Sequence, residues 1–265
     1  MSGSRVRRWL GLTAATAALA AVPGAPASAA ATPRAQLFSG VGAVGALFIR
    51  GPHNTLHSHF CSGSVVNSPG GDLVITAAHC LDGRTPRQIA FVPGYNAGRE
   101  PYGVWPAREM LRDGKWVSGA APDLDIAFLL VGQAGTAKSL QSMTGAEGLG
   151  KPSDNQRVLT IGYPDSQSRP VGCVNVIKDA DGSPVEFDCG GYTMGTSGGP
   201  LIAAFNPVTG LGVVVGVIGG YQQGGYSDAV SYTARFGQQV TALYAKAIRM
   251  RPPAPPRHRH RHRRR

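Results

Sequence analysis

The sequence predicts an all-β protein of antiparallel sheets, on three observations. Glycine and proline are abundant, with 37 and 20 of 265 residues. Short β-rich runs recur between turn signals such as residues 68–71 and 181–183, and helix-period patterns are nearly absent before residue 232. Many short strands with glycine-rich turns indicate a sandwich or a barrel, and at this length two barrels fit better than one.

The N-terminus has the pattern of an export signal. Three arginines precede an apolar run at residues 9–22, which is too short to span a bilayer comfortably, and residues 27–29 form a small-residue cleavage site. The alternative is a retained N-terminal anchor. We expect residues 1–29 to be a signal peptide, used by the general or the twin-arginine export route, and the mature protein to be secreted and extracellular.

The body of the chain divides at a segment rich in Gly, Ala, Ser and Thr, residues 132–152. This segment is the natural crossing between two barrels. We therefore assign residues 37–135 to an N-terminal barrel and residues 136–231 to a C-terminal barrel, after a short segment at residues 30–36. Whether that short segment is a propeptide stays open.

A helix and a basic tail follow the second barrel. Apolar side chains recur at helical spacing between Phe236 and Ile248, which predicts an amphipathic helix at residues 232–250. A proline cluster then ends the helix. Residues 251–265 alternate arginine with histidine, a composition typical of disorder.

The net charge of +11 belongs to the ends of the chain. Ten of the 26 basic residues lie in residues 1–29 and 251–265, so the body carries 16 basic against 15 acidic residues. A near-neutral body argues against a specific nucleic-acid partner. The tail could bind an anionic surface or cell-wall polymer, nucleic acid or a metal, or it could be a solvated terminus, and both readings stay open.

The four cysteines fall into two local pairs, Cys61 with Cys80 and Cys173 with Cys189. Export makes disulfides permissible, and three connectivities are possible. Each local bridge would contribute about 3 kcal/mol by loop-closure arithmetic. A metal site is the competing interpretation, but the chain has no Cys-x-x-Cys spacing.

Ser197 lies in the run Gly-Thr-Ser-Gly-Gly-Pro at residues 195–200. Glycines on both sides let the backbone make a tight turn that exposes the hydroxyl. They also let the amides of Gly195 and Ser197 converge on one point, as an oxyanion hole requires. For this run alone, a flexible surface turn is the alternative.

His79 ends the run Thr-Ala-Ala-His and is followed directly by Cys80. A bridge from Cys80 to Cys61 would fix the histidine-bearing turn to a neighbouring strand, and a general base needs such fixed placement. A histidine after an apolar run is often a structural residue. The neighbours of His79 favour the catalytic role.

Asp125 precedes an apolar run at residues 126–131, which places its carboxylate at the mouth of a strand. There it could accept a hydrogen bond from Nδ1 of His79 and leave Nε2 free for Ser197. Asp123, two positions earlier, is the local alternative.

The sequence resembles the chymotrypsin-like (trypsin-like) serine peptidase family, in particular its secreted bacterial branch. The resemblance rests on four blocks between about residues 37 and 250: Cys-Ser-Gly-Ser-Val-Val, Thr-Ala-Ala-His-Cys, Asp-Ile-Ala-Phe-Leu and Gly-Thr-Ser-Gly-Gly-Pro. It implies two six-stranded antiparallel β-barrels with the catalytic residues in the cleft between them, and a C-terminal helix. It also implies an endopeptidase that cleaves proteins or peptides through an acyl-enzyme; we expect a monomer without cofactor or metal.

The resemblance gives each catalytic residue a role. His79 is the general base, Asp125 orients it, and Ser197 is the nucleophile. The amides of Gly195 and Ser197 form the oxyanion hole, and the bridge of the histidine loop joins Cys61 to Cys80. Animal members carry Asp before the serine, where it pairs with a new N-terminal amine after cleavage. Thr196 stands there in this chain, so we expect no activation by that route.

Primary specificity depends on positions near the nucleophile. In the family, the residue six before the serine lines the pocket floor, and here it is Gly191, so the carboxylate that selects Arg or Lys is missing. The strand edge beside the pocket also lacks the histidine of some glutamate-specific relatives. We expect a neutral, small-to-apolar P1 preference. The predicted substrate-binding residues are Gly191, Tyr192, Ile218, Gly219 and Gly220.

Three alternatives concern other features. His53, His57 and His59 could bind zinc or copper, or they could belong to a solvated loop. An esterase would also use Gly-x-Ser-x-Gly, but that fold needs its histidine after the serine, and the later histidines here lie in the tail. A catalytically weak or inactive binding protein on a peptidase scaffold, tethered by its basic tail, is the second functional hypothesis.

Overall fold

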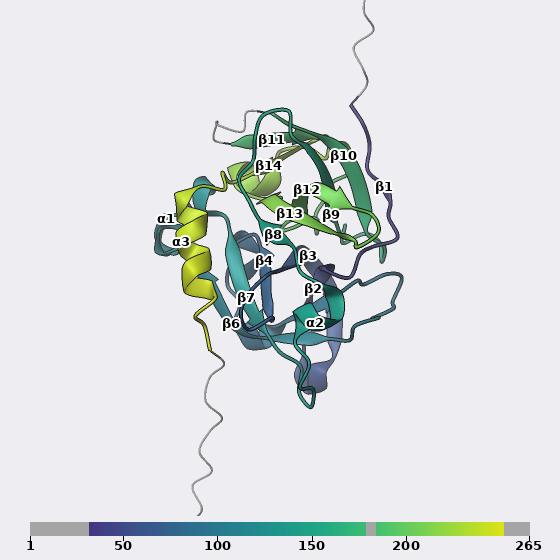
Figure 1. Cartoon of the computed structure of the whole chain (residues 1–265), viewed down its shortest axis with the longest axis vertical. Helices are drawn as coiled ribbons and strands as arrows, with labels where there is room; N and C mark the ends of the chain where they lie inside the picture. The colour runs from purple at the N-terminus through teal and green to yellow at the C-terminus, as the bar shows by residue number, and fades with distance from the viewer. Residues whose placement is uncertain (1–31, 179–183, 252–265) are drawn as a thin grey trace, which may run out of the picture. The chain divides into compact units, whose positions relative to one another are not determined.

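The structure is a computed structural model that describes residues 32–178 and 184–251 (Figure 1). The predicted signal peptide and nearly all of the basic tail lie outside the described residues. Among the helices of the described segments, none is both long and apolar enough to cross a membrane.

The first half of the described chain forms a closed six-stranded antiparallel barrel, in the order β2-β3-β4-β7-β6-β5. Large side chains such as Leu47, Phe91 and Trp105 are fully buried inside it. Gly45 lies so close to the ring of Phe91 that a Cβ there would come within 2.8 Å of it, so this strand position requires glycine. The strands are β2 (Val44–Arg50), β3 (Leu56–Val66), β4 (Leu73–Thr76), β5 (Ile89–Pro93), β6 (Trp105–Arg112) and β7 (Ala127–Val131).

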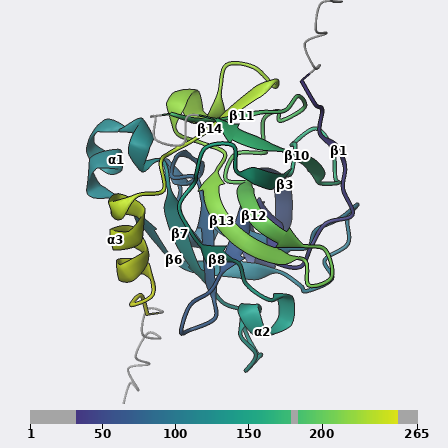
Figure 2. The same cartoon turned by 45° about the horizontal axis from the view of Figure 1, so that its top comes forward.

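The second half forms a larger sheet, in the order β14-β11-β10-β9-β12-β13-β8, with β1 paired to β10. The pairings are antiparallel except that of β8 with β13, which lie side by side in Figures 1 and 2. The strands are β1 (Gln36–Leu37), β8 (Gly148–Leu149), β9 (Arg157–Gly162), β10 (Val171–Lys178), β11 (Val185–Asp188), β12 (Pro200–Asn206), β13 (Leu211–Val217) and β14 (Val230–Thr233).

The sheet closes on itself, since the C-terminal end of β13 lies beside β14 without forming a ladder with it. The backbone N–H of Gly219 donates to the carbonyl of Tyr232 at 2.9 Å, and the N–H of Val217 donates to Oγ1 of Thr233 at 2.9 Å. The predicted all-β fold with two barrels and a C-terminal helix is therefore confirmed. The second barrel differs in detail, since β1 and β8 add two short strands to the six from β9 to β14.

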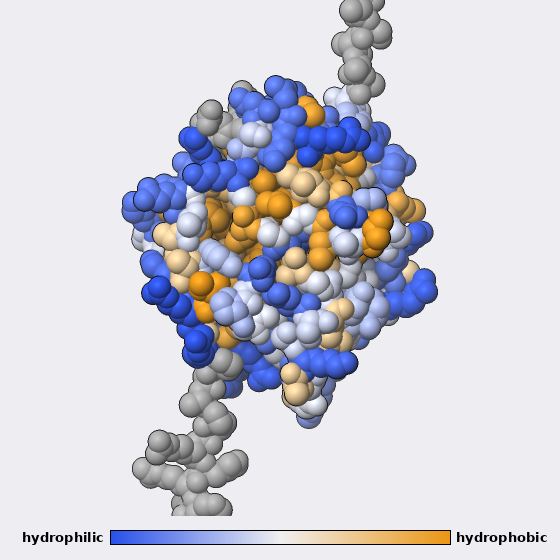
Figure 3. Space-filling view, viewed as in Figure 1, coloured by the Kyte–Doolittle hydropathy of each residue, from blue (hydrophilic) through white to orange (hydrophobic). Residues whose placement is uncertain are grey.

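Helix α3 (Gln238–Ala247) packs on the first barrel. Its residues Val240, Leu243 and Ala247 belong to one buried cluster with Ile126 and Phe128. On the face drawn in Figure 3, hydrophobic residues reach the surface in the middle and hydrophilic residues surround them. The remaining helices are α1 (Gly114–Gly119), α2 (Leu140–Thr144), and the short turns η1 (Pro52–Asn54), η2 (His79–Leu81), η3 (Pro86–Gln88), η4 (Pro122–Leu124) and η5 (Tyr221–Gly224).

Candidate active site

Strands β4 and β7 bring two of the predicted catalytic residues to the same end of the first barrel. The strands are antiparallel neighbours, with Thr76 opposite Ala127. His79 opens η2 just after β4, and Asp125 is the C-cap of η4 just before β7. The sheet register therefore sets the spacing of the two side chains.

The carboxylate of Asp125 is fully buried and accepts three hydrogen bonds. Its Oδ2 accepts from Nδ1 of His79 at 2.7 Å and from the backbone N–H of Gly220 at 2.7 Å, and its Oδ1 accepts from the backbone N–H of His79 at 2.8 Å. Because a carboxylate only accepts, this arrangement keeps a proton on Nδ1 and leaves the lone pair of Nε2 free. Asp123 is exposed, and the ring contact comes from Asp125.

Gly219 makes room for this buried carboxylate. A Cβ at Gly219 would lie 2.9 Å from Oδ2 of Asp125 and 3.2 Å from the Cβ of Ala77. Gly219 and Gly220, two of the predicted substrate-binding residues, both lie against Asp125, and neither lines the cleft described below.

The turn that carries Ser197 depends on two glycines with left-handed backbone. Gly195 has φ +90°, and a Cβ there would lie 2.6 Å from the carbonyl oxygen of Tyr163. Gly198 has φ +79°, and a Cβ there would lie 2.2 Å from Oγ1 of Thr76. Side chains are excluded at both positions, so the turn presents the hydroxyl of Ser197 from a fixed backbone.

Two backbone amides of this turn differ from their neighbours in having no acceptor among the described residues. The N–H groups of Thr196, Gly198 and Gly199 donate to backbone carbonyls. Within the described segments, the amides of Gly195 and Ser197 donate to no protein acceptor. These two donors are therefore available to an incoming oxygen.

Ser62 of β3 ties the turn at residues 195–199 to the first barrel, a role that no sequence motif predicts. Its backbone N–H donates to the carbonyl of Ser197 at 2.7 Å. Its buried hydroxyl donates to the carbonyl of Gly195 at 3.0 Å and accepts from the N–H of Tyr163 at 2.8 Å. In the sequence this position belongs to the block Cys-Ser-Gly-Ser-Val-Val, but the contacts of Ser62 depend on the tertiary structure.

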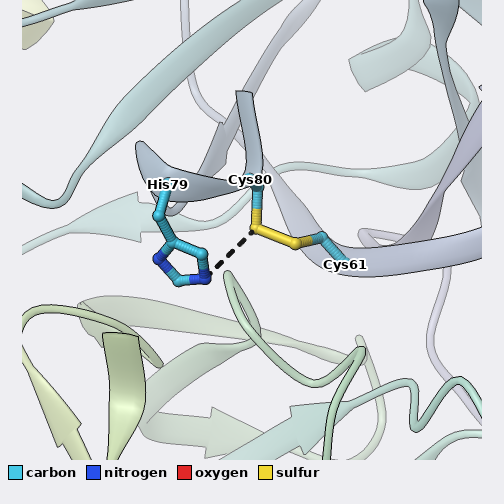
Figure 4. A group of neighbouring side chains, drawn as sticks. All are labelled: Cys61, His79 and Cys80. Carbon is cyan, nitrogen blue, oxygen red and sulfur yellow. Dashed lines mark hydrogen bonds between the residues drawn. A yellow bond between two sulfur atoms is a disulfide. The ribbon is translucent and has the colours of Figure 1, made fainter. Parts of the chain in front are cut away.

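The imidazole of His79 lies beside the disulfide that joins Cys61 to Cys80 (Figure 4). Its Nε2 is 3.9 Å from Sγ of Cys80. Both sulfurs are used in the bridge, so they offer no thiolate to a metal ion. The second disulfide joins Cys173 to Cys189, so both pairs are local.

His79 and Ser197 line one cleft with a volume of about 840 Å³. The first barrel contributes Phe60, the disulfide and Arg84 to this cleft. The second contributes the turn at residues 195–197, Ile218 and residues 222–228. Of the predicted pocket residues, Tyr192 and Ile218 line this cleft and Gly191 does not. The hydroxyl of Tyr192 points away into the barrel, where it donates to the carbonyl of Thr160 at 2.6 Å and burial raises its pKa.

The cleft has lining residues that no motif predicted. Met194 and Tyr226 are 79% and 78% exposed and lie on the two loops that flank it. Asp165 and Asp228 also line it. These residues belong to loops without a periodic pattern, so the sequence carried no signal for them.

The histidine cluster before Cys61 separates in the structure. His53 and His57 are exposed, whereas His59 is buried against Phe48, and its Nε2 lies 2.8 Å from the carbonyl oxygen of Pro164. In the described part of the chain, no group of three possible metal ligands includes these histidines.

Residues 61–211, more than half of the chain, match the family model of the trypsin-like peptidase domain. The chain belongs to the trypsin-like peptidase family. Solved structures of this fold agree. Protease Anisep from Arthrobacter nicotinovorans is 22% identical, with a TM-score of 0.67 over 81% of this chain and 99% of that one.

Two further structures are similar to this trypsin-like chain. The thermostable serine protease AL20 from an extremophilic microorganism is 25% identical, with a TM-score of 0.66 over 79% of this chain and 98% of that one. Human heparin binding protein is 14% identical, with a TM-score of 0.59 over 84% of this chain and all of that one, and its likeness shows the fold alone. None of the curated proteins matches the sequence.

Proposed function

We propose that this trypsin-like protein is a secreted serine endopeptidase that cleaves peptide bonds with Ser197, His79 and Asp125. The observation that carries the proposal is the hydrogen bond from Nδ1 of His79 to the buried Asp125, in a cleft that Ser197 also lines. A serine hydroxyl needs a base with a fixed tautomer, and this pairing supplies one.

The reaction proceeds through an acyl-enzyme. Nε2 of His79 takes the hydroxyl proton as Oγ of Ser197 attacks the scissile carbonyl carbon, and the amides of Gly195 and Ser197 bind the oxyanion. His79 then gives the proton to the leaving amine, and the C–N bond breaks. A water molecule, deprotonated by His79, attacks the ester and releases the acid and free Ser197.

For primary specificity we propose a neutral, small-to-apolar P1 residue. Gly191 supplies no carboxylate, and Ile218, Met194 and Tyr226 give the cleft apolar walls. The acidic side chain of Asp228 is the feature in this cleft that would favour a cationic P1 residue instead.

The remaining proposals concern the whole chain. We propose that residues 1–29 direct export and are removed, and that the protein is an extracellular monomer. Two local disulfides suit that compartment. We also propose that the tail at residues 251–265 attracts anionic surface or cell-wall polymer. For the barrels we propose the boundaries 37–135 and 136–231, except that Leu37 of β1 pairs with β10 of the second barrel.

Hydrolysis of a quenched peptide library by the secreted full-length protein tests the function. The wild type should cleave, and Ser197→Ala should abolish cleavage. Ser58→Ala is the matched control, because this exposed serine lines the same cleft outside the motif. A folded wild type that cleaves nothing but is retained on anionic polymer through its tail would favour the tethered binding protein.

A further inference from the structure

Arg84 is a cation held inside the catalytic cleft by neutral groups. Its guanidinium carbon lies 4.3 Å from the centre of the Phe60 ring. Its Nη1 donates to the carbonyl oxygens of Cys80 at 3.4 Å and Asp82 at 3.3 Å. The side chain is half-buried and lines the same cleft as His79.

No carboxylate neutralises Arg84 within the described segments. Asp82 is the acidic residue nearest in sequence, but its Oδ1 accepts from Nη1 of Arg112 at 2.6 Å and from Nε1 of Trp116 at 3.2 Å. Stacking and carbonyl contacts fix the position of the guanidinium without cancelling its charge. Arg84 therefore presents an unpaired positive charge to whatever occupies this part of the cleft.

This part of the cleft lies on the side where the leaving peptide passes. The predicted P1 pocket belongs to the second barrel, where Tyr192 and Ile218 line it. The first barrel contributes Phe60, the disulfide of Cys80 and Arg84 to the cleft, and Sγ of Cys80 is 3.9 Å from Nε2 of His79. Since Nε2 delivers its proton to the leaving amine, the residues that follow the scissile bond run along this part of the cleft.

We infer that Arg84 is a specificity-determining residue that favours an acidic side chain among the first three residues after the scissile bond. The inference rests on the proposed peptidase function. Side chains of an extended peptide alternate between two sides, so the preference acts at P1′ and P3′ or at P2′ alone. Asp165 lines the same cleft from the second barrel, beside Met194 and Gly195, so the cleft carries a negative charge as well as that of Arg84.

Quenched peptides with one acyl part and Glu, Gln or Lys at P1′, P2′ and P3′ in turn test the inference. For each variant, the kcat/KM of every peptide is divided by the kcat/KM of an anilide that has the same acyl part. The anilide has no residue after the scissile bond, so the ratio reports only the residues that follow that bond. At the positions on one side of the extended peptide, the wild type should prefer Glu over Lys about threefold to fivefold. A preference of this size matches the free energy of a partly exposed ion pair. That preference should shrink at high salt.

Three variants separate charge from structure. Arg84→Gln should bring the ratio of Glu to Lys close to one, and Arg84→Lys should restore most of it. Arg87→Gln is the control, because Arg87 is exposed and lies outside the cleft lining, and it should match the wild type. If the wild type cleaves the anilide but hydrolyses the Glu and Lys peptides at equal rates, the inference is wrong. It is also wrong if the preference for Glu survives in Arg84→Gln. A wild type that leaves the anilide intact overturns the proposed function as well.

Discussion

Asp125 holds His79 through both carboxylate oxygens: Oδ1 accepts the backbone N–H at 2.8 Å and Oδ2 accepts the ring Nδ1–H at 2.7 Å. The first bond fixes the backbone position of His79, and the second fixes the orientation of its ring and its tautomer. One buried carboxylate thereby sets both the position of the imidazole and the ring nitrogen that carries the lone pair.

Asp125→Asn should leave the protein folded and lower kcat by about four orders of magnitude. The amide can still accept one bond, but its NH₂ group cannot accept the Nδ1 proton, so the ring adopts the wrong tautomer. Steady-state hydrolysis of a peptide anilide measures the effect. Asp123→Asn, an exposed neighbour, should stay within a factor of two of the wild type. Equal losses in both variants would count against the assigned role of Asp125.

Ser62→Ala should lower kcat more than it changes KM. The variant leaves the carbonyl of Gly195 and the N–H of Tyr163 without their buried partner, at a cost of about 1–3 kcal/mol in unfolding free energy. Because Gly195 supplies an oxyanion-hole amide in our proposal, the loosened turn should cost catalysis as well. Ser64→Ala is the matched control, since Ser64 is buried on the same strand and bonds to Ala43. If Ser64→Ala harms kcat equally, the effect of Ser62 is merely one of stability.

A neutral P1 preference predicts that a library is cleaved after small or apolar residues, with little cleavage after Arg, Lys or Glu. Asp228→Asn should then change the profile by less than a factor of two. The rates of matched anilides with Ala, Leu, Lys and Glu at P1 provide the measurement. Strong cleavage after Lys that disappears in Asp228→Asn would show that this carboxylate, and not the absence of one at Gly191, decides the charge of the P1 residue.

Glu147 should make stability fall with pH. Its carboxyl is fully buried, Oε2 accepts from the N–H of Gly212, and Oε1 has no partner in the described segments. Burial raises its pKa from 4.5 to about 7. The unfolded chain therefore loses this proton first, and stability declines between about pH 4.5 and about pH 7, by about 3 kcal/mol in total, with the loss complete above that pKa.

Glu147→Gln should flatten this part of the pH profile. The segments packed around Glu147, which are the end of β3, β8, β13 and α2, carry no charged side chain there, so the change isolates one titration. Urea unfolding between pH 4.5 and pH 8, with Ser197→Ala in both proteins to prevent self-cleavage, gives the difference curve. Parallel curves for the two proteins would mean that Glu147 does not titrate in this range.

The sequence could predict the local parts of the site because each lies beside its own marker. His79 precedes Cys80, Asp125 precedes an apolar strand, and Ser197 lies between glycines. In each case the neighbouring residues explain why that type of side chain stands at that position. The all-β class followed from turn signals in the same way.

The parts that escaped prediction depend on contacts between distant segments. Ser62 of the first barrel donates a hydrogen bond to the carbonyl of Gly195 in the second barrel. Gly219 faces Asp125 because β13 ends beside η4. The two-residue strands β1 and β8 are too short for any periodic pattern. Within the described part of the chain, the charge of Arg84 is unneutralised because Asp82 pairs with Arg112, a contact that sequence spacing does not predict.

Labelling with a biotinylated fluorophosphonate tests whether Ser197 is an activated nucleophile, because this reagent reacts only with an activated serine. The secreted full-length protein should form a single adduct on the peptide that contains Ser197. Ser197→Ala should form none, and His79→Gln should react at least a thousandfold more slowly. A folded wild type that remains unlabelled, or an adduct on another serine, would contradict the account.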